Sequence, residues 1–413
     1  MPRKSSQEEL TGSVKSCFAN CLGLKSGQIC NVDYKTGGSP DEDCAVTRPF
    51  QQTFRVSDQK IMLCTLHKNS NEYRRIRTMV DLNLCTHFTF GSWYSYNSTE
   101  NKLYPKRNFI IRERPGKEYA QQRRGIKSIM VFGSLKSDEW SNVAADPNSR
   151  MKLIDQMIQI MEEEKFDGLG VDWRFSACPD SDCSKGKRRD KENLVTLMRE
   201  LFPMTKERGK LLLLLLPSPD KILDAGYDLK ALWNSVDYFY IYTHGYTGLW
   251  NNYFDYPTTQ YYIGGTVNSL KGRIGLAKMR KVLGGFAPQV ILYALEKPNP
   301  KPAFRDSIKK DRSYYANMSE LCQKVQSENY KIVLDDLKNN CAHNTTHAYV
   351  YEDYNTLKEK INLFKASGVG GLVVGELLAD DEINKCGRGP MPILRIASEL
   401  FHGTSCIIKQ CVN

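Results

Sequence analysis

The sequence predicts an α/β protein whose strand–helix units close into a (β/α)8 barrel, also called a TIM barrel. Short apolar runs alternate with amphipathic stretches along most of the chain, as a parallel sheet with crossover helices requires. Leu211 to Leu216 is an unbroken leucine run that ends at Pro217, which is typical of a parallel strand buried on both faces. At 413 residues the chain is long enough for one such barrel with insertions.

The predicted elements follow one another in that order. Apolar strands are predicted at 60–66, 85–90, 126–133 and 166–175. Later strands are predicted at 211–216, 238–243, 290–295 and 368–374. Apolar faces predict amphipathic helices over 153–161, 194–202 and 357–364, and the first of these is expected to be capped by Asn148 or Ser149. Because the strands are parallel, we expect the functional face at their carboxyl ends.

The fourth predicted strand, Phe166 to Phe175, carries the most informative residues. Alternate side chains of a strand share a face, so Gly170, Asp172 and Arg174 are expected to point into the barrel together. That face would hold a single carboxylate, followed after one intervening residue by a guanidinium. A binding or catalytic centre at this place would depend on that pair.

The same run resembles the signature of the family 18 glycoside hydrolases, the chitinases and chitinase-like lectins, which reads Asp-Gly-x-Asp-x-Asp-x-Glu. Asp167, Gly168 and Asp172 match this pattern. Gly170 stands in place of the middle Asp, and Arg174 stands in place of the terminal Glu, which is the family's proton donor. The resemblance therefore implies a catalytically degenerate member.

The resemblance covers residues 58 to 403. Besides the signature, it is carried by Leu84–His87, Val236–Thr243, Gly370–Gly371 and Asp380–Asp381. It implies disulfides between Cys64 and Cys85 and between Cys322 and Cys386. It also implies an insertion between strands seven and eight, at 297–348, which we expect to be reduced because it is short and polar. Residues 1–57 are expected to form a disulfide-stapled extension, and 404–413 form a cysteine-containing tail.

The substitution at position 174 decides the expected chemistry. Hydrolysis of a glycosidic bond needs a carboxylic acid that protonates the leaving oxygen. An arginine stays protonated at physiological pH, so Arg174 cannot take this part. We expect no hydrolysis, and an ion pair between Arg174 and Asp172 at the top of the barrel. The alternative is a hydrolase with relocated chemistry that uses Asp172, Glu376 or Asp380.

By the same resemblance, the positions that grip N-acetylglucosamine in the family are also changed. The residues found there are Thr65, Ser92, Gly133-Ser134-Leu135, Tyr242-Thr243-His244-Gly245 and Gly375. Trp250 still matches the family and Trp93 lies beside Ser92, but we interpret both tryptophans as loop packing. His244 is expected to be a packed residue and not a metal ligand. The aromatic surface on which a sugar ring would stack is therefore expected to be lost.

A basic loop follows the fourth strand. Cys178 and Cys183 are expected to form a disulfide at its base, and the charges beyond them are Lys185, Lys187, Arg188 and Arg189. A loop at this end of a barrel strand lies over the mouth, and the chain carries a net charge of +11. We therefore expect a mouth that attracts an anion, such as a sulphated or acidic glycan or an acidic protein surface. A solvated charge run without a partner is the alternative.

The thirteen cysteines fall into local groups, which favours a secreted, disulfide-bonded protein. The pairing of the remaining cysteines stays open: Cys17, Cys21, Cys30, Cys44, Cys341, Cys406 and Cys411. Sequons at Asn97, Asn317 and Asn344 are compatible with glycosylation. The first residues are polar, so we expect that a secretory leader is missing from this sequence.

Several classes of function are disfavoured. No apolar run is long enough to span a membrane. The spacing of cysteines and histidines, including His343 and His347, predicts no metal site, and no cofactor is expected. A secreted chain makes nucleic acid an unexpected partner. The sequence therefore predicts a secreted chitinase-like protein without hydrolytic activity that binds a glycan or a protein. A structural or storage protein without a ligand is the remaining alternative.

Overall fold

The structure is a computed structural model that describes residues 60–66, 84–91, 94–106, 125–133, 135–303, 305–334 and 339–403. The predicted extension 1–57 and tail 404–413 lie outside the described residues, as do Ser92, Trp93 and Ser134. Within the described part, no helix is both long and apolar enough to cross a membrane.

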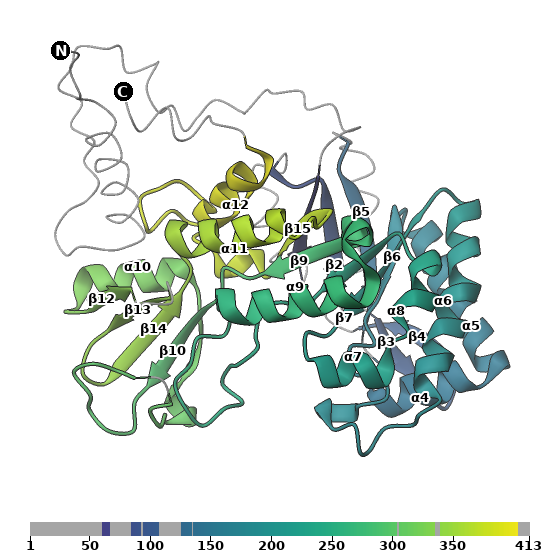
Figure 1. Ribbon diagram of the computed structural model, residues 1–413, viewed down its shortest axis with the longest axis horizontal. Coiled ribbons are helices and arrows are strands. Elements are labelled where there is room, and N and C mark those ends of the chain that lie inside the picture. Colours follow the sequence, from purple (N-terminus) through teal and green to yellow (C-terminus); the bar gives the residue numbers. More distant parts are fainter. Residues whose placement is uncertain are drawn as a thin grey trace, which may run out of the picture.

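Eight parallel strands close into a barrel, as the sequence predicts (Figure 1). In chain order they are β1 (Ile61–Leu66), β2 (His87–Gly91), β5 (Lys127–Phe132), β6 (Gly168–Val171), β7 (Leu211–Leu216), β8 (Tyr238–Ile241), β9 (Val282–Phe286) and β15 (Gly371–Val374). Each strand pairs with its neighbour in this order, and β15 closes the ring on β1. All the carboxyl ends therefore open on one face.

The leucine strand β7 shows why the barrel forms. Leu212, Leu214 and Leu216 pack in the large cluster between the strands and the outer helices. Leu213 and Leu215 pack in a smaller cluster that fills the barrel interior with Leu63, Val131 and Tyr240. A strand that buries both faces needs apolar side chains at every position, and this run supplies them.

Helices cover the outside of the barrel (Figure 1). They are α4 (Ser137–Ala145), α5 (Pro147–Glu163), α6 (Asp190–Glu207), α7 (Asp220–Gly226), α8 (Leu229–Leu232), α9 (Gln260–Ile274), α11 (Tyr354–Ala366) and α12 (Pro392–His402). The cap of α5 is Asp146, whose side chain accepts the Ser149 N–H, and not Asn148 or Ser149 as expected. Pro147 at the first helical position moves the start of the helix towards the amino end of the chain.

The seventh barrel strand differs from the prediction. It is β9, whereas Val290–Ala294, predicted as a barrel strand, is β10 of a separate sheet. Two glycines, Gly284 and Gly285, interrupt the apolar run of β9 and hide its strand signal. Gly284 is required because a Cβ there would lie 2.3 Å from the Phe364 ring of α11. The helix packs directly on this strand.

The insertion between barrel strands seven and eight is present, and it begins before the predicted residue 297. It begins at β10 and forms a five-stranded antiparallel sheet in the order β11-β10-β14-β13-β12, with helix α10 (Met318–Ser327) beside it. The further strands are β11 (Tyr314–Ala316), β12 (Lys331–Leu334), β13 (Asn340–His343) and β14 (His347–Tyr351). In Figure 1 this sheet stands on the opposite side of the barrel from α4, α5 and α6.

All three predicted disulfides are present, linking Cys64 to Cys85, Cys178 to Cys183 and Cys322 to Cys386. The first joins the region of β1 to that of β2, and the third ties α10 of the insertion to the loop before α12. Cys341 is buried in β13, and the other six cysteines lie outside the described residues. A short hairpin, β3 (Tyr94–Asn97) and β4 (Lys102–Pro105), follows β2.

Candidate functional site

The centre of the site lies just beyond the carboxyl end of β6. The strand ends at Val171, so Asp172 and Arg174 follow it instead of continuing it as predicted. The Asp172 N–H donates to the Phe132 carbonyl at 2.8 Å, which fixes the segment against β5. The Arg174 guanidinium donates to both Asp172 oxygens, from Nε at 2.7 Å and from Nη2 at 2.8 Å. The predicted ion pair is therefore present and bidentate.

The local sequence holds this pair in position. A Cβ at Gly133 would lie 2.8 Å from the Asp172 Cβ, so glycine at that place makes room for the carboxylate. Trp173, between the paired residues, points away and stacks on Trp140 of α4 with ring centroids 5.8 Å apart. The Tyr227 hydroxyl donates to the Trp173 carbonyl at 2.5 Å. These contacts leave the pair little freedom to separate.

The guanidinium of Arg174 also lies over an aromatic ring. Its central carbon is 4.4 Å from the centroid of the Tyr242 ring, a cation–π geometry. Burial opposes the charge, but the Asp172 carboxylate outweighs it, so the pKa of Arg174 is raised above its usual value. The Arg174 side chain is 32 % exposed and that of Asp172 is 11 % exposed. Arg174 is therefore a fixed cation that cannot serve as a proton donor.

Tyr242 belongs to an aromatic row along the end of β8. Tyr240, Tyr242 and His244 alternate along the chain, and the Tyr242 and His244 ring centroids are 3.8 Å apart. Burial raises the pKa of both tyrosines. The sequence argument missed Tyr242 as a partner of Arg174, although the period of two along Tyr240 and Tyr242 was a usable signal.

His244 fills space that a larger residue at the end of β15 would need. A Cβ at Gly375 would lie 3.2 Å from the His244 Nε2, and a Cβ at Gly285 would lie 3.2 Å from its Nδ1. His244 is 3 % exposed, which agrees with the prediction of a packed residue. The ring therefore occupies the barrel mouth between two glycines.

Glu376 stands beside this row. Its backbone is left-handed, with φ 50° and ψ 60°, and its N–H donates to the Thr65 hydroxyl at 3.0 Å. The carboxylate acts electrostatically on both Tyr240 and Tyr242, where its charge raises the pKa of the phenols. Among the residues that the structure describes, no hydrogen bond or ion pair engages the side chain of Glu376.

Trp250 lies in the loop after β8 and packs against Gly248 of its own loop, in line with the interpretation from the sequence, but its side chain stays 58 % exposed. A Cβ at Gly248 would meet both the Trp250 ring, at 2.5 Å, and the Tyr315 hydroxyl, at 2.8 Å. The ring edge also approaches the Cβ position of Gly245, as does Tyr242. An exposed aromatic face therefore lies between the barrel centre and the insertion.

Two other acidic residues named from the sequence, Asp167 and Asp380, stabilise the fold by accepting backbone N–H groups. The Asp167 carboxylate accepts from the Ser128 N–H at 3.0 Å and from its hydroxyl at 3.3 Å, at the amino end of β6. Asp380 is fully buried and accepts the N–H groups of Ile393 and Leu394 at the start of α12. Burial raises the pKa of Asp380 to about 7, against the opposing effect of these hydrogen bonds.

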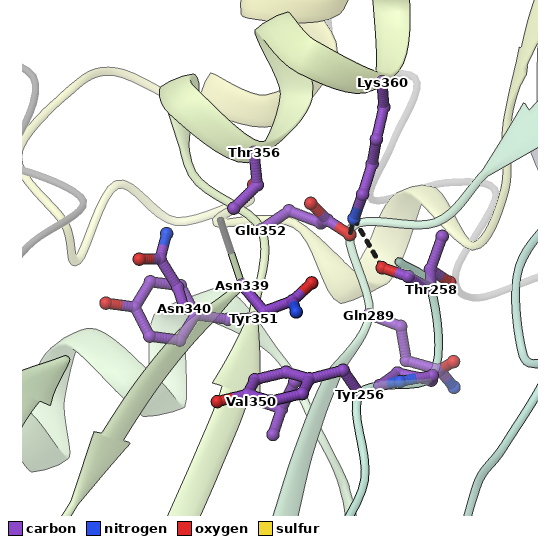
Figure 2. Close-up of a pocket in the computed structure, with 11 residues that line it drawn as sticks. Tyr256, Thr258, Gln289, Asn339, Asn340, Val350, Tyr351, Glu352, Thr356 and Lys360 are labelled. Carbon is purple, nitrogen blue, oxygen red and sulfur yellow. Dashed lines mark hydrogen bonds and ion pairs between the residues drawn. The ribbon is translucent and has the colours of Figure 1, made fainter. Parts of the chain in front are cut away.

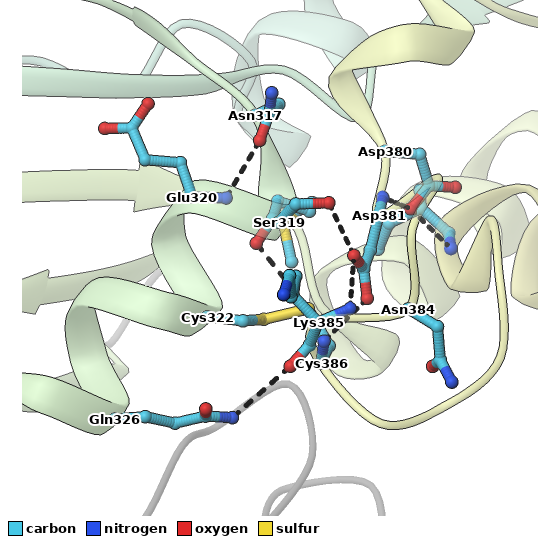
Figure 3. The surroundings of a disulfide bond; sticks show 12 residues. Asn317, Ser319, Glu320, Cys322, Gln326, Asp380, Asp381, Asn384, Lys385 and Cys386 are labelled. Atoms are coloured by element: carbon cyan, nitrogen blue, oxygen red, sulfur yellow. Dashed lines mark hydrogen bonds between the residues drawn. A yellow bond between two sulfur atoms is a disulfide. The ribbon is translucent and has the colours of Figure 1, made fainter. Parts of the chain in front are cut away.

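Asp381 has a similar structural part (Figure 3). It accepts from the Ser319 hydroxyl at 2.5 Å and from the Lys385 and Cys386 N–H groups at 2.8 and 2.7 Å. These bonds surround the disulfide of Cys386 and join the insertion to the loop before α12. Asp380 and Asp381 are therefore committed to the fold.

The cations of the basic loop are exposed, and the loop is held by contacts within itself and with neighbouring helices. Lys185, Lys187, Arg188 and Arg189 are all exposed. Lys185 pairs with Asp182 at 3.4 Å, and Lys187 donates to Asn142 of α4 at 2.9 Å. A Cβ at Gly186 would lie 1.8 Å from the Ala177 carbonyl oxygen, so the loop packs tightly on its own base. Its described contacts run to α4 and α7, and none joins it to Arg174.

A polar pocket lies where the insertion meets the barrel (Figure 2). Lys360 of α11 is buried there, donates to the Thr258 carbonyl at 2.6 Å and pairs with Glu352. Tyr256, Gln289 and Asn339 line the same pocket, among others. Because Lys360 joins α11 to both Glu352 and Thr258, this pocket is a structural junction between insertion and barrel.

The sequons and histidines occupy surface turns and strand ends. Asn97 and Asn344 accept N–H groups of their own turns, and Asn317 caps α10 by accepting the Glu320 N–H at 2.8 Å. His343 is buried at the end of β13, and His347 contacts Thr346. In the described part of the chain, no cluster of three potential metal ligands occurs.

Comparison with known proteins places this geometry in a family. The model of "Glycosyl hydrolases family 18" matches residues 65–380. The "Probable chitinase 10" of Drosophila melanogaster is 24 % identical over 356 residues, covering 78 % of this chain and 15 % of that protein. The chain thus spans only a small part of that relative. The "Chitinase-like mite allergen Der f 18.0101" of Dermatophagoides farinae is 22 % identical, covering 78 % of this chain and 71 % of the allergen.

Solved structures share the fold. Catalytic domain 2 of the Group II chitinase of Ostrinia furnacalis superposes with a TM-score of 0.75 at 19 % identity, covering 84 % of this chain and 99 % of that one. Human YKL-39, described as a pseudo-chitinase with retained chitooligosaccharide binding, gives a TM-score of 0.69 at 16 % identity, covering 83 % of this chain and 99 % of that one. At such identities the likeness establishes the barrel and its insertion, and nothing about the chemistry of this chain.

Proposed function

The chain belongs to the glycosyl hydrolases family 18, and from this premise we propose that it is a secreted member that does not hydrolyse glycosidic bonds and acts by binding a glycan. The observation that carries the proposal is the bidentate contact between Arg174 and Asp172. The position where the family's signature holds its proton donor has a guanidinium, and the remaining carboxylate of the strand end is occupied by it.

Hydrolysis is disfavoured for a chemical reason. The leaving oxygen must receive a proton, and Arg174 has a raised pKa and keeps its protons. Asp172 gives both oxygens to Arg174, and Asp380 is buried under the start of α12. Of the three acids considered for relocated chemistry, only Glu376 keeps an uncommitted carboxylate. One such group without a positioned partner is a weak basis for glycosidase chemistry, so binding is the better proposal.

Two surfaces are suited to a glycan. The exposed aromatic face of Trp250 lies in the loop after β8, at the carboxyl end of the barrel, and sugar rings pack well on such faces. The basic loop displays Lys185, Lys187, Arg188 and Arg189 to solvent. Exposed cations of one sign raise the local concentration of an anionic ligand, such as a sulphated or acidic polysaccharide. An acidic protein surface would be attracted by the same loop.

Secretion and glycosylation are part of the proposal. Three disulfides within the described residues are compatible with an oxidising compartment. The Asn97, Asn317 and Asn344 side chains are each partly exposed, which leaves space for a glycan at each sequon. Digestion with an amidase that removes N-linked glycans, followed by mass spectrometry, would show which of the three carry one.

Calorimetric titration tests the binding proposal. The protein is titrated with the N-acetylglucosamine tetramer and with a sulphated polysaccharide, each at low and at raised salt. We expect that the protein binds a glycan. The affinity for the sulphated ligand should fall steeply as salt is added, because ions screen exposed charges. Substitution of Lys187, Arg188 and Arg189 by Glu should lower the affinity for the sulphated ligand by about tenfold or more.

A matched control carries the same change of charge elsewhere. The exposed residues Lys152, Lys271 and Lys358 lie on the outer helices α5, α9 and α11. Their substitution by Glu should lower the affinity for the sulphated ligand far less. Equal weakening by both triple variants would mean that net charge alone attracts the ligand. Absence of binding to either class of glycan, by protein that unfolds cooperatively, would refute the proposed function.

A further inference from the structure

We propose that the disulfide between Cys178 and Cys183 is a site of thiol–disulfide exchange, at which an external dithiol opens the base of the basic loop. The oxidised loop binds an anionic ligand, and reduction weakens that binding. The effect on binding rests on the proposed function, because the same loop carries the cations assigned there to an anionic ligand. The exchange itself depends only on the backbone and the exposure of the disulfide.

The backbone around this disulfide is the first observation. Asp180 and Ser181, inside the disulfide ring, have φ 52° and 67°, and Ala177, just before Cys178, has φ 58°. The Ser181 N–H donates to the Cys178 carbonyl at 3.0 Å, which closes a tight turn within the ring. Left-handed backbone is unfavourable for residues with a Cβ, and it persists where the surrounding structure enforces it. The disulfide therefore closes a strained turn, which can relax once the ring is opened.

The accessibility of this disulfide is the second observation. Cys183 is partly exposed, and its Sγ lies 3.9 Å from the Lys221 carbonyl oxygen of α7. The sequence separation of Cys178 and Cys183 is 5 residues, against 21 and 64 for the other two disulfides of the described chain. The four cysteines of those two disulfides are buried: Cys64, Cys85, Cys322 and Cys386. Strained or exposed disulfides exchange most readily, and a short loop adds less stability when it is closed.

The exchange balances in two steps. A thiolate of the dithiol attacks the Sγ of Cys183, the bond to Cys178 breaks, and the Cys178 sulfur leaves as a thiolate that takes up a proton. The second thiolate of the dithiol then attacks the mixed disulfide at the reductant's own sulfur and releases Cys183, which is protonated in turn. Two electrons pass to the protein, which ends with two thiols, and the dithiol ends as a disulfide after losing its two protons.

Reduction should loosen the cations that follow the ring. Lys185 comes two residues after Cys183 and pairs at 3.4 Å with Asp182, which lies inside the ring. Asp182 also accepts the Ser184 N–H at 3.0 Å, so it orders the start of the cationic run. Once the ring is open, ordering these cations against a ligand costs more conformational entropy. The reduced protein should therefore bind an anionic ligand more weakly.

Graded reduction tests the exchange site. The whole protein is equilibrated with mixtures of reduced and oxidised dithiothreitol, the free thiols are alkylated, and the peptides are identified by mass spectrometry. We expect Cys178 and Cys183 to be half reduced at a ratio of reduced to oxidised dithiothreitol at least about tenfold lower than the ratio needed for the two buried disulfides. Equal or earlier reduction of either buried disulfide would overturn the proposal.

Glycine substitutions test the backbone strain. The variant Ala177→Gly/Asp180→Gly/Ser181→Gly removes the Cβ at each left-handed position, so reduction of its disulfide should need a dithiothreitol ratio about tenfold higher than in wild type. Lys165→Gly is the matched control, because Lys165 has a φ of 58° and lies exposed after α5, and it should leave the ratio unchanged. A triple glycine variant that is reduced as easily as wild type would contradict the assigned strain.

Binding of the sulphated polysaccharide is measured separately. Wild-type protein reduced only at this disulfide, and the variant Cys178→Ala/Cys183→Ser, should each bind it about threefold or more weakly than the oxidised protein. Hydrogen exchange of the loop amides should be faster in both. Unchanged affinity after reduction would overturn the control of binding by this disulfide. Absence of binding by the oxidised protein would refute the proposed function, and graded reduction would still decide whether the exchange site exists.

Discussion

The two ends of the barrel use similar side chains for different purposes. At the amino end, Asp167 and Asp237 each accept a backbone N–H of a neighbouring strand, at Ser128 and at Leu212. At the carboxyl end, Asp172 is held by the side chain of Arg174, and Glu376 has no such partner within the described chain. The first pattern pins strands together, whereas the second leaves polar groups at a surface.

This difference shows that the acidic residues of one short segment can have separate roles. Asp167 and Asp172 both match the family's motif and lie in one short segment, yet they face opposite ends of the barrel. Asp167 keeps its part in the scaffold whether or not the protein is an enzyme. The fate of the chemistry depends on the carboxyl end alone, in agreement with the general division of this fold into a stabilising face and a functional face.

The largest expected effect comes from breaking the pair at the carboxyl end. Arg174→Leu leaves the Asp172 carboxylate mostly buried without its cation. Loss of one partner of a buried pair is strongly destabilising, and because Arg174 is 32 % exposed we expect a smaller loss, of about 2–3 kcal/mol. Denaturant unfolding measures it.

The double variant Asp172→Leu/Arg174→Leu should recover much of that loss, since no charge is left unpaired. Arg273→Ala, which breaks a surface network with Asp220 and Asp224, should lose at most about 1 kcal/mol. Equal losses from Arg174→Leu and Arg273→Ala would show that the central pair is no more than a surface contact.

A substitution at the amino end of the barrel should lower the free energy of unfolding and leave the ligand affinity unchanged. Asp167→Ala removes the acceptor for both the N–H and the hydroxyl of Ser128, and we expect a loss of about 2 kcal/mol. The folded protein should bind the same glycans with unchanged affinity. Asp311→Ala, at an exposed position, is the control that should change neither property. A change of ligand affinity in Asp167→Ala would contradict the division between the two ends.

The pH dependence of stability sharpens the comparison, because the pKa values of His87 and Asp380 are shifted in opposite directions. Burial lowers the pKa of His87 at the amino end to about 4, so His87 contributes stability above pH 6.5 that is lost as the pH falls towards 4. The pKa of Asp380 is raised to about 7, so Asp380 contributes stability below pH 4 that is lost as the pH rises through 7. Between pH 5 and pH 7 the two effects nearly cancel.

Single substitutions remove that cancellation. His87→Asn should make the protein about 2 kcal/mol more stable at pH 5 than at pH 7, relative to wild type. Asp380→Asn should make the protein more stable at pH 7 than at pH 5 by a similar amount, relative to wild type. It should also lower the stability at both pH values, because Asp380 accepts N–H groups at the start of α12. Unfolding curves at the two pH values measure both. Parallel pH profiles of all three proteins would exclude this account of His87 and Asp380.

The smallest expected effect on stability lies in the basic loop. Reversal of Lys187, Arg188 and Arg189 changes exposed side chains, so the free energy of unfolding should change by no more than about 0.5 kcal/mol per residue. Lys187→Ala alone tests the bond to Asn142. A large loss in these variants would mean that the loop is part of the scaffold and not a binding surface.

Much of this organisation could be predicted from the sequence. The leucine run of β7 and the alternation of strands and helices predicted the barrel, and the residues around Asp172 predicted the ion pair. The seventh barrel strand and the start of the insertion were missed, because Gly284 and Gly285 weaken the strand pattern of β9 and the apolar run of β10 resembles a barrel strand. The local pattern also could not show that the contacts of the basic loop run to α4 and α7.

The aromatic row and the strain at Glu376 were harder to foresee. Tyr240 and Tyr242 alternate in the sequence, but the contact of Tyr242 with Arg174 depends on how strands β6 and β8 end across the barrel. The left-handed backbone of Glu376 has no signature in residue type, since glycine is the residue normally expected there. Features that join distant strand ends appear only once the barrel is closed.

Incubation with fluorogenic chitin oligomers from acid to neutral pH tests the central claim most directly, with an active family 18 chitinase as the positive control. We predict no release of fluorophore above the blank, because the proposal assigns the place of the proton donor to Arg174, which keeps its protons. Turnover by the wild-type protein that Asp172→Ala or Glu376→Ala abolishes would contradict the account.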